Sequence, residues 1–89
     1  MQKFPLGRVV ATPGALAELA RLDINPLLLI GRHVSGDDGD LDAEDKATNV
    51  LALQTGARIF SSYLVGDVKL WVITEADRSS TCVLLPEEY

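Results

Sequence analysis

The sequence predicts a single α+β domain, in which about three N-terminal helices pack on a C-terminal three-stranded antiparallel β-meander. Apolar residues recur at helical spacing up to about residue 55. From Arg58 onward, β-branched and aromatic residues dominate in short runs separated by turn residues. With 89 residues, of which 47% are hydrophobic, the chain has material for one core. Helices followed by strands favour an antiparallel sheet with the helices gathered against it.

Two helices are predicted to begin at a proline that directly follows a capping residue. Thr12 precedes Pro13, and Asn25 precedes Pro26. The side-chain oxygen of Thr or Asn accepts a hydrogen bond from a free backbone N–H, and proline in the first turn sacrifices no hydrogen bond. We therefore expect one helix from residue 13 to about residue 22 and a second over residues 26–34.

The apolar faces of these two helices differ in width. The first helix places a narrow set of apolar side chains on one side: Leu16, Leu19 and Ala20. The second helix carries the run Leu27 to Ile30 and is apolar on most sides. We expect the second helix to be central and well covered by the rest of the domain.

A third helix is predicted over residues 43–55. Asp42 is a capping residue, and Gly56 supplies the left-handed residue that commonly ends a helix. Two acidic residues in the first turn interact favourably with the helix dipole. The side chains expected to face the domain are spaced at helical intervals: Ala47, Val50, Leu51 and Gln54.

The sheet is predicted from three runs of strand-forming residues. They cover residues 58–65, 68–74 and 81–85. Gly66 and Asp67 form a two-residue hairpin connection, a longer loop spans residues 75–80, and Pro86 ends the last strand because it has no N–H to donate. Residues 9–11 would add a short strand at an edge, and Phe4 would lie across the core.

Both faces of the middle strand carry apolar side chains. Leu70 and Val72 point to one face, while Trp71 and Ile73 point to the other. If the helices cover only one face, the second face needs another cover. Two covers are open at this point: a partner chain, which favours a homodimer, or the N-terminal segment around Phe4.

The formal charge of −5 is concentrated in one segment. Six acidic residues and no basic residue lie between Asp37 and Asp45, and the rest of the chain holds seven acidic against eight basic residues. The basic residues are scattered and form no cluster, so general nucleic-acid binding is disfavoured. An electrostatic function is expected to map to this acidic segment, residues 37–45.

Composition also indicates the cellular environment. The longest apolar run, Pro26 to Ile30, is far too short to cross a bilayer, and the N-terminal residues do not resemble an export signal. The single cysteine, Cys82, excludes an internal disulfide and is expected to be a small buried side chain in a strand. We expect a cytoplasmic protein that does not contact membranes.

The acidic segment allows three interpretations. Asp38, Asp40 and Asp42 alternate as calcium ligands do, but Ala43 and Asn49 stand where a calcium loop requires Gly and Glu. The segment is otherwise a solvated loop leading into a helix, or a docking patch for a basic partner. Its candidate binding residues are Asp37, Asp38, Asp40 and Asp42.

Two further groups are candidates for chemistry. The loop after the second strand contains Glu75, Asp77 and Arg78, and Arg78 has the donor geometry to bind a phosphate or a carboxylate. Alternatively, Asp77 folds back on nearby backbone N–H groups and Arg78 pairs with Glu75 or Asp77. His33, the only histidine, is a packing residue at a helix end, a partner of Asp37 or Asp40, or a catalytic base acting with Arg78.

The chain resembles a family of small bacterial proteins that are encoded on plasmids, integrative elements and other mobile DNA and that have no established activity. The resemblance rests on KLWVITEADRS at 69–79, LLPEEY at 84–89, FPLG at 4–7, VATPGAL at 10–16, RHV at 32–34, GD at 36–37 and EDK at 44–46. Members tend to carry Trp in place of Asp38 and a basic residue in place of Ala47 or Thr48. The resemblance implies a genetic context and no particular chemistry.

These observations together favour a non-enzymatic accessory protein of mobile DNA. It would act as a homodimer and bind a host or element-encoded protein through the acidic segment or through the sheet face that carries Trp71. Two alternatives remain at this stage: a minimal nucleic-acid-cleaving enzyme using His33, Arg78 and a carboxylate, and a weak metal- or ligand-binding module at the acidic segment. No cofactor is expected.

Overall fold

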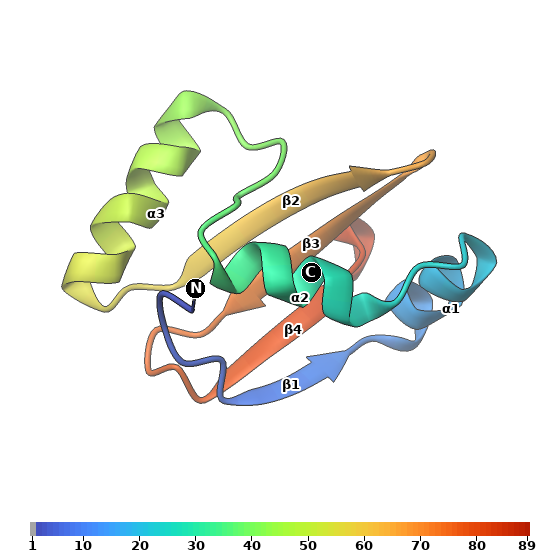
Figure 1. The fold of residues 1–89 in the computed structure, drawn as a ribbon, viewed down its shortest axis with the longest axis horizontal. Helices are drawn as coiled ribbons and strands as arrows, with labels where there is room; N and C mark the ends of the chain where they lie inside the picture. Colours follow the sequence, from blue (N-terminus) through green and yellow to red (C-terminus); the bar gives the residue numbers. More distant parts are fainter. Residues whose placement is uncertain (1) are drawn as a thin grey trace.

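A computed structural model describes residues 2–89 of the protein. Its elements follow the chain in the order β1 (Arg8–Ala11), α1 (Pro13–Arg21), α2 (Pro26–Val34), α3 (Ala43–Thr55), β2 (Ile59–Val65), β3 (Val68–Thr74), β4 (Ser80–Leu84) and the 3₁₀ helix η1 (Pro86–Glu88). The strands form one sheet in the order β1-β4-β3-β2 (Figure 1). The α+β class and the three helices are confirmed.

The sheet is mixed, which corrects the prediction of a three-stranded antiparallel meander. Strands β2, β3 and β4 are antiparallel neighbours, but β1 adds a fourth strand that runs parallel to β4. The edge strand expected over residues 9–11 is therefore confirmed, and it begins one residue earlier. Backbone hydrogen bonds hold it at both ends, from Arg8 N–H to the Ser79 carbonyl (2.9 Å) and from Thr12 N–H to the Val83 carbonyl (3.0 Å).

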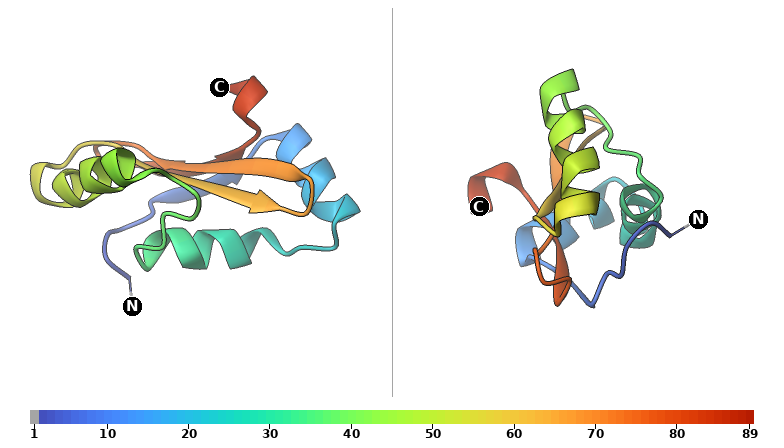
Figure 2. Two further views of the ribbon diagram at one scale, coloured as in Figure 1. Left: turned by 90° about the horizontal axis from the view of Figure 1, so that it is seen from above. Right: turned by 90° about the vertical axis from the view of Figure 1, so that its left-hand side faces the viewer.

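The helices surround the sheet instead of forming one layer on it. Helix α2 covers one face, η1 and the C-terminus lie on the other face, α1 lies at one end, and α3 lies beyond the β2 edge (Figure 2). The main core is therefore built between α1, α2 and the sheet. Its buried side chains are Ala15, Leu19, Leu29, Ile30, Tyr63, Leu70, Val72 and Val83.

The predicted helix starts are confirmed, whereas the predicted buried faces are partly wrong. Thr12 and Asn25 accept hydrogen bonds from Ala15 N–H (3.1 Å) and Leu27 N–H (3.0 Å), respectively. Helix α2 is not covered on most sides, because only the α2 face that meets the sheet is buried. The exposed side chains that had been expected to pack include Leu16, Leu27, Leu28, Val50 and Leu51.

The free edge of β2 is closed by groups from α3 and from the acidic segment. The Asn49 side chain accepts from Phe60 N–H (3.1 Å) and donates to the Phe60 carbonyl. Two residues along β2, Ser62 N–H donates to the Asp38 carbonyl (3.1 Å) and the Ser62 carbonyl accepts from Asp40 N–H (2.7 Å). These contacts satisfy backbone groups that an edge strand otherwise leaves open to another strand.

No helix among residues 2–89 combines the length and the apolar character that crossing a bilayer requires.

Candidate functional site

The acidic segment and the Trp71 sheet face, which the sequence offered as separate candidates, meet in one surface groove. The groove has a volume of about 290 Å³ and lies beside the β2 and β3 strands on the sheet face opposite α2. We call it the acidic–aromatic groove. It is lined by Asp40, Leu41, Asp42, Asp45, Phe60, Ser62, Lys69 and Trp71.

Aromatic side chains fix Trp71 in the groove. Its ring meets Phe60 edge to face, with centroids 4.9 Å apart, and meets Tyr89 at 5.8 Å. Edge-to-face pairs of this kind stabilise the position of both rings. The Trp71 side chain is half-buried, so part of its surface remains exposed to solvent.

The C-terminal segment provides the cover for this face that the sequence left undecided. Ile73 is only 5% exposed within the single chain, so it does not need a partner chain as its cover. The alternative cover, the N-terminal segment around Phe4, is also wrong. Phe4 packs on the other side of the sheet, against Ala52 and Ile59.

The three carboxylates of the groove differ in the hydrogen bonds that they accept from the protein. Asp40 accepts a hydrogen bond from Leu64 N–H (2.6 Å), and Asp42 caps α3 by accepting from Asp45 N–H (2.8 Å). The Asp45 carboxylate has no hydrogen bond or ion pair to residues 2–89 and is fully available. Lys69 also forms no ion pair within that range. Three carboxylates against this one lysine give the groove a net negative charge.

Asp37 and Asp38 do not belong to this groove. The Asp37 carboxylate pairs with Arg32 (2.7 Å), and the hydrogen bond from Arg32 lowers the pKa of Asp37. Asp38 instead lines a different pocket beside α3, where burial raises its pKa. The residues of the acidic segment therefore line two separate surfaces, and Asp37 forms a local ion pair with Arg32.

The loop with Glu75, Asp77 and Arg78 lies between β3 and β4 and lines none of the groove. Arg78 donates to the carbonyls of Ala57 (2.7 Å) and Ala52 (3.2 Å), and also to those of Glu75 and Ala76. Its guanidinium thus holds the C-terminal end of α3 and is not free to bind a phosphate. Asp77 accepts from Ser79 N–H (3.0 Å), which confirms that it folds back on the local backbone.

His33 lies in the core and has no exposed surface. Its Nδ1 is 2.6 Å from Ser61 Oγ, its Nε2 is 2.8 Å from Thr74 Oγ1, and Thr74 Oγ1 is 2.7 Å from Thr81 Oγ1. Thr81 donates its only hydroxyl proton to the Leu6 carbonyl (2.8 Å).

These contacts fix the direction of every hydrogen bond in the His33 chain. Because the Thr81 proton is used, Thr74 donates to Thr81, and the Thr74 oxygen then accepts from His33. Nε2 therefore carries the proton, and Nδ1 accepts from Ser61. Burial lowers the pKa of His33 to about 4, so the ring is neutral at pH 7 and pairs with neither Asp37 nor Asp40.

Cys82 lies in β4 and is half-buried. Burial raises the pKa of its thiol, which keeps the sulfur protonated and unreactive. Within residues 2–89, no three His, Cys, Asp or Glu side chains converge as a metal site requires.

The sequence interpretation missed Phe60, Lys69 and Asn49. Phe60 and Trp71 lie on one face of the sheet in neighbouring strands, but this follows only from the register that places Ser62 opposite Trp71. The sequence did not indicate that Asn49 contacts the sheet, because a polar residue in a helix usually faces solvent.

No family model, curated protein or solved structure matches the chain.

Proposed function

We propose that the protein is a small non-enzymatic interaction protein that binds a basic segment of a partner protein in the acidic–aromatic groove. The observation that carries this proposal is the meeting of Asp40, Asp42 and Asp45 with Trp71 in one depression. A lysine or arginine side chain gains from lying over an indole ring, by about 0.5–1 kcal/mol at an exposed site. The carboxylates around the ring favour the same cation and speed its approach.

The charge of the groove favours a different protein over a second copy as the partner. A symmetric dimer formed through this groove would bring the same three carboxylates of two chains together. Like charges in contact oppose association, whereas a basic partner removes this cost. The proposed partner is therefore a host or element-encoded protein, in line with the resemblance to proteins of mobile DNA, and its basic surface is one that would otherwise contact nucleic acid.

The catalytic alternative receives less support from the geometry. A general base must reach the proton that it removes, but His33 is fully buried and both of its ring nitrogens are hydrogen-bonded. The Arg78 guanidinium already donates hydrogen bonds to the backbone carbonyls around the C-terminal end of α3.

Trp71 is the only tryptophan, so its fluorescence reports directly on the groove. We expect a saturable fluorescence change on titration with a lysine- and arginine-rich peptide and none with a glutamate-rich peptide of equal length. The change should weaken as salt is added, because salt screens exposed charges. Light scattering should give a monomer without the peptide. A salt-insensitive change or a response to both peptides would contradict the proposal.

A further inference from the structure

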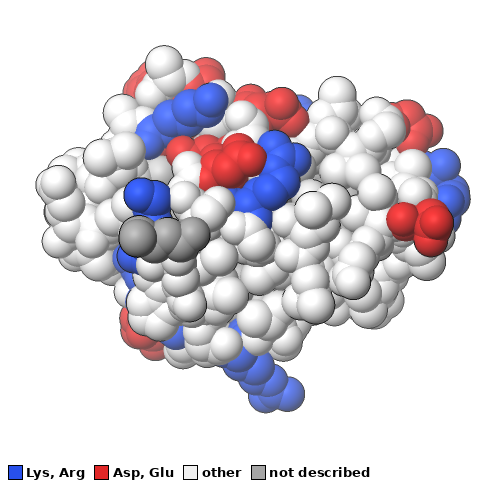
Figure 3. Space-filling model, viewed as in Figure 1, with Lys and Arg blue, Asp and Glu red and all other residues white. Residues whose placement is uncertain are grey.

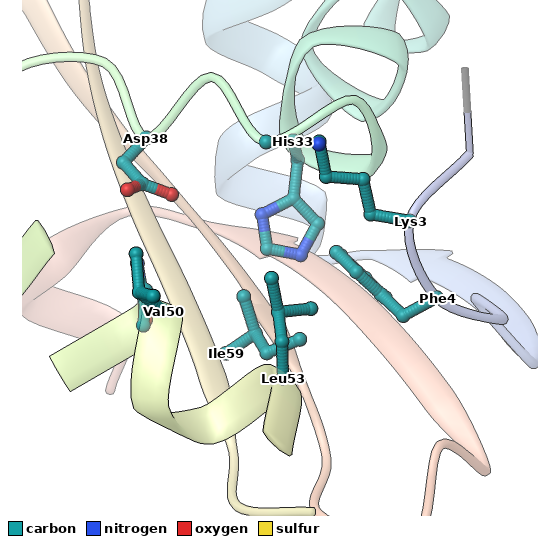
Figure 4. A pocket seen from close by; sticks show the side chains of 9 residues that line it. Lys3, Phe4, His33, Asp38, Val50, Leu53 and Ile59 are labelled. Carbon is teal, nitrogen blue, oxygen red and sulfur yellow. The ribbon is translucent and has the colours of Figure 1, made fainter. Parts of the chain in front are cut away.

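A second pocket, with a volume of about 280 Å³, lies between α3, the loop that follows α2 and the N-terminal segment (Figure 4). It is separate from the acidic–aromatic groove and shares no lining residue with it. Its walls are apolar and are formed by Phe4, Val50, Leu53 and Ile59. Lys3 and Asp38 line it with charged side chains.

The pocket exists because α3 contacts the rest of the domain through a narrow strip. Only Asn49 and Ala52 of this helix are buried. The neighbouring side chains Val50 and Leu53 remain 59% and 40% exposed although they are apolar. Covering apolar surface of this kind is favourable, so the pocket has a driving force to bind an apolar group.

The two charged residues of the pocket are available to a ligand. Among residues 2–89, neither Lys3 nor Asp38 forms an ion pair. Burial raises the pKa of Asp38, against smaller opposing influences of the Asn49 amide and of the Lys46 charge, because a carboxylate withdrawn from water is harder to ionise.

The backbone holds Lys3 in place beside the pocket. Lys3 N–H donates to the Val34 carbonyl (2.9 Å). A Cβ atom on Gly36, whose φ is +93°, would lie 2.9 Å from Lys3 Cε, so the glycine allows the lysine chain to cross this loop. Figure 4 shows Lys3 and Asp38 on opposite sides of His33, and Figure 3 shows basic and acidic side chains side by side on this face.

We propose that this pocket binds a small zwitterion with an apolar side chain, namely a free α-amino acid such as leucine, methionine or phenylalanine. The ammonium group would pair with Asp38, the carboxylate with Lys3, and the side chain would fill the apolar walls. The volume lies just below the range of pockets for drug-sized ligands, which fits a ligand of amino-acid size. His33 offers no free donor or acceptor at the floor, which favours an apolar side chain over a polar one.

Thermal unfolding of the full chain with L-leucine and two analogues tests this proposal. Isopentylamine lacks the carboxylate of leucine, and 4-methylpentanoate lacks its ammonium group. A ligand that binds only the folded state raises Tm with concentration. We expect leucine to raise Tm at millimolar concentration and both analogues to do so much less. No rise with any apolar amino acid, or an equal rise with either analogue, would overturn the proposal.

Variants locate the effect within the molecule. Asp38→Asn and Lys3→Met should each weaken leucine binding by at least about tenfold, the loss expected for one charge-assisted contact. Leu53→Trp should abolish binding by filling the pocket, whereas Leu51→Trp, on the same helix but outside the pocket, should leave it unchanged. Equal effects of the two tryptophan variants would place the ligand elsewhere. Peptide binding measured by Trp71 fluorescence should persist in Asp38→Asn and Lys3→Met, which add no second tryptophan, so this site and the groove can fail independently.

Discussion

His33 shows how one residue acquires a role that its sequence position does not indicate. The sequence placed it near the end of a helix next to an acidic segment, where an ion pair or a catalytic role was reasonable. Its actual partners, Ser61 and Thr74, are 28 and 41 residues away. Because these contacts depend on how α2 crosses β2 and β3, no local pattern could predict them.

The buried neutral ring predicts a specific dependence of stability on pH. The folded pKa of His33 is about 4 against an ordinary value of 6.5, so the unfolded chain binds a proton that the folded chain refuses. Stability is therefore fully present above pH 6.5 and is lost as the pH falls towards 4. The slope should approach about 1.4 kcal/mol per pH unit, measured by urea unfolding at a series of pH values.

The matched variant for this prediction is His33→Gln. It removes the titrating ring, so the extra slope between pH 6.5 and 4 should vanish even if overall stability is lower. The aspartates with lowered pKa, Asp37, Asp67 and Asp77, act mainly below this window, because their ordinary value is 3.8. Glu88, whose pKa is lowered from 4.5, contributes at the lower end of the window equally in both proteins. Equal slopes in the two proteins would show that His33 does not carry the effect.

At the scale of elements, helix α3 was predicted with its correct bounds and the wrong buried face. Asp42 and Gly56 marked its ends by local hydrogen bonding and backbone conformation, which sequence reveals directly. Its orientation depends on Asn49, which pairs with the backbone of β2. Since α3 lies against a strand edge and not on the sheet face, its apolar side chains Val50 and Leu51 were not drawn into the core.

The parallel pairing of β1 with β4 could not be predicted from the sequence either. A four-residue run of strand-forming residues before a helix indicates an edge strand but not its neighbour. The parallel contact with β4 joins residues more than seventy positions apart, with Val9 opposite Thr81. Local turns specify antiparallel hairpins, whereas a parallel neighbour is chosen by the packing of all the intervening elements.

Because the acidic segment closes the β2 edge, we expect Gly39→Ala to disturb this closure. Gly39 has φ of +73°, and an added Cβ would collide with the Ser62 carbonyl oxygen that Asp40 N–H binds. The substitution should displace the acidic segment, lower the free energy of unfolding by about 2–4 kcal/mol through strain and unpaired backbone groups, and promote strand-mediated aggregation. Urea unfolding and thioflavin fluorescence measure these two results.

Gly56→Ala is the matched control for this change. Gly56 has a similar φ of +77°, but an added Cβ meets no atom within 4 Å. It should therefore cost only the backbone strain, about 1–2 kcal/mol, and should not promote aggregation. If both alanine variants lost the same stability and aggregated alike, the acidic segment would not protect the edge.

At the scale of the whole molecule, the acidic segment is not a uniform charged patch. The sequence located the charge correctly, but the fold divides its residues among the β2 edge, the α3 cap, the Arg32 pair, the pocket and the groove. Neutralising the whole segment would therefore disturb folding as well as binding. A test of binding has to use residues without structural contacts.

Asp45 and Glu44 provide such a test. Both lie in the first turn of α3, both are exposed, and only Asp45 lines the groove. Asp45→Lys should weaken binding of the basic peptide by at least about tenfold, whereas Glu44→Lys, with the same change in net charge, should weaken it much less. Trp71 fluorescence measures both. A loss that follows net charge alone, equal in the two variants, would argue against a localised site.

The most direct test of the proposed function is an NMR titration of the ¹⁵N-labelled protein with the lysine- and arginine-rich peptide. We predict that the Trp71 indole N–H and the amides of Phe60, Ser62 and Asp45 shift together and saturate at one peptide per chain. The amides of the 75–79 loop should stay unchanged, since this loop lies outside the groove. Shifts confined to that loop or to α2, with the Trp71 indole unaffected, would contradict the assignment of the groove as the binding site.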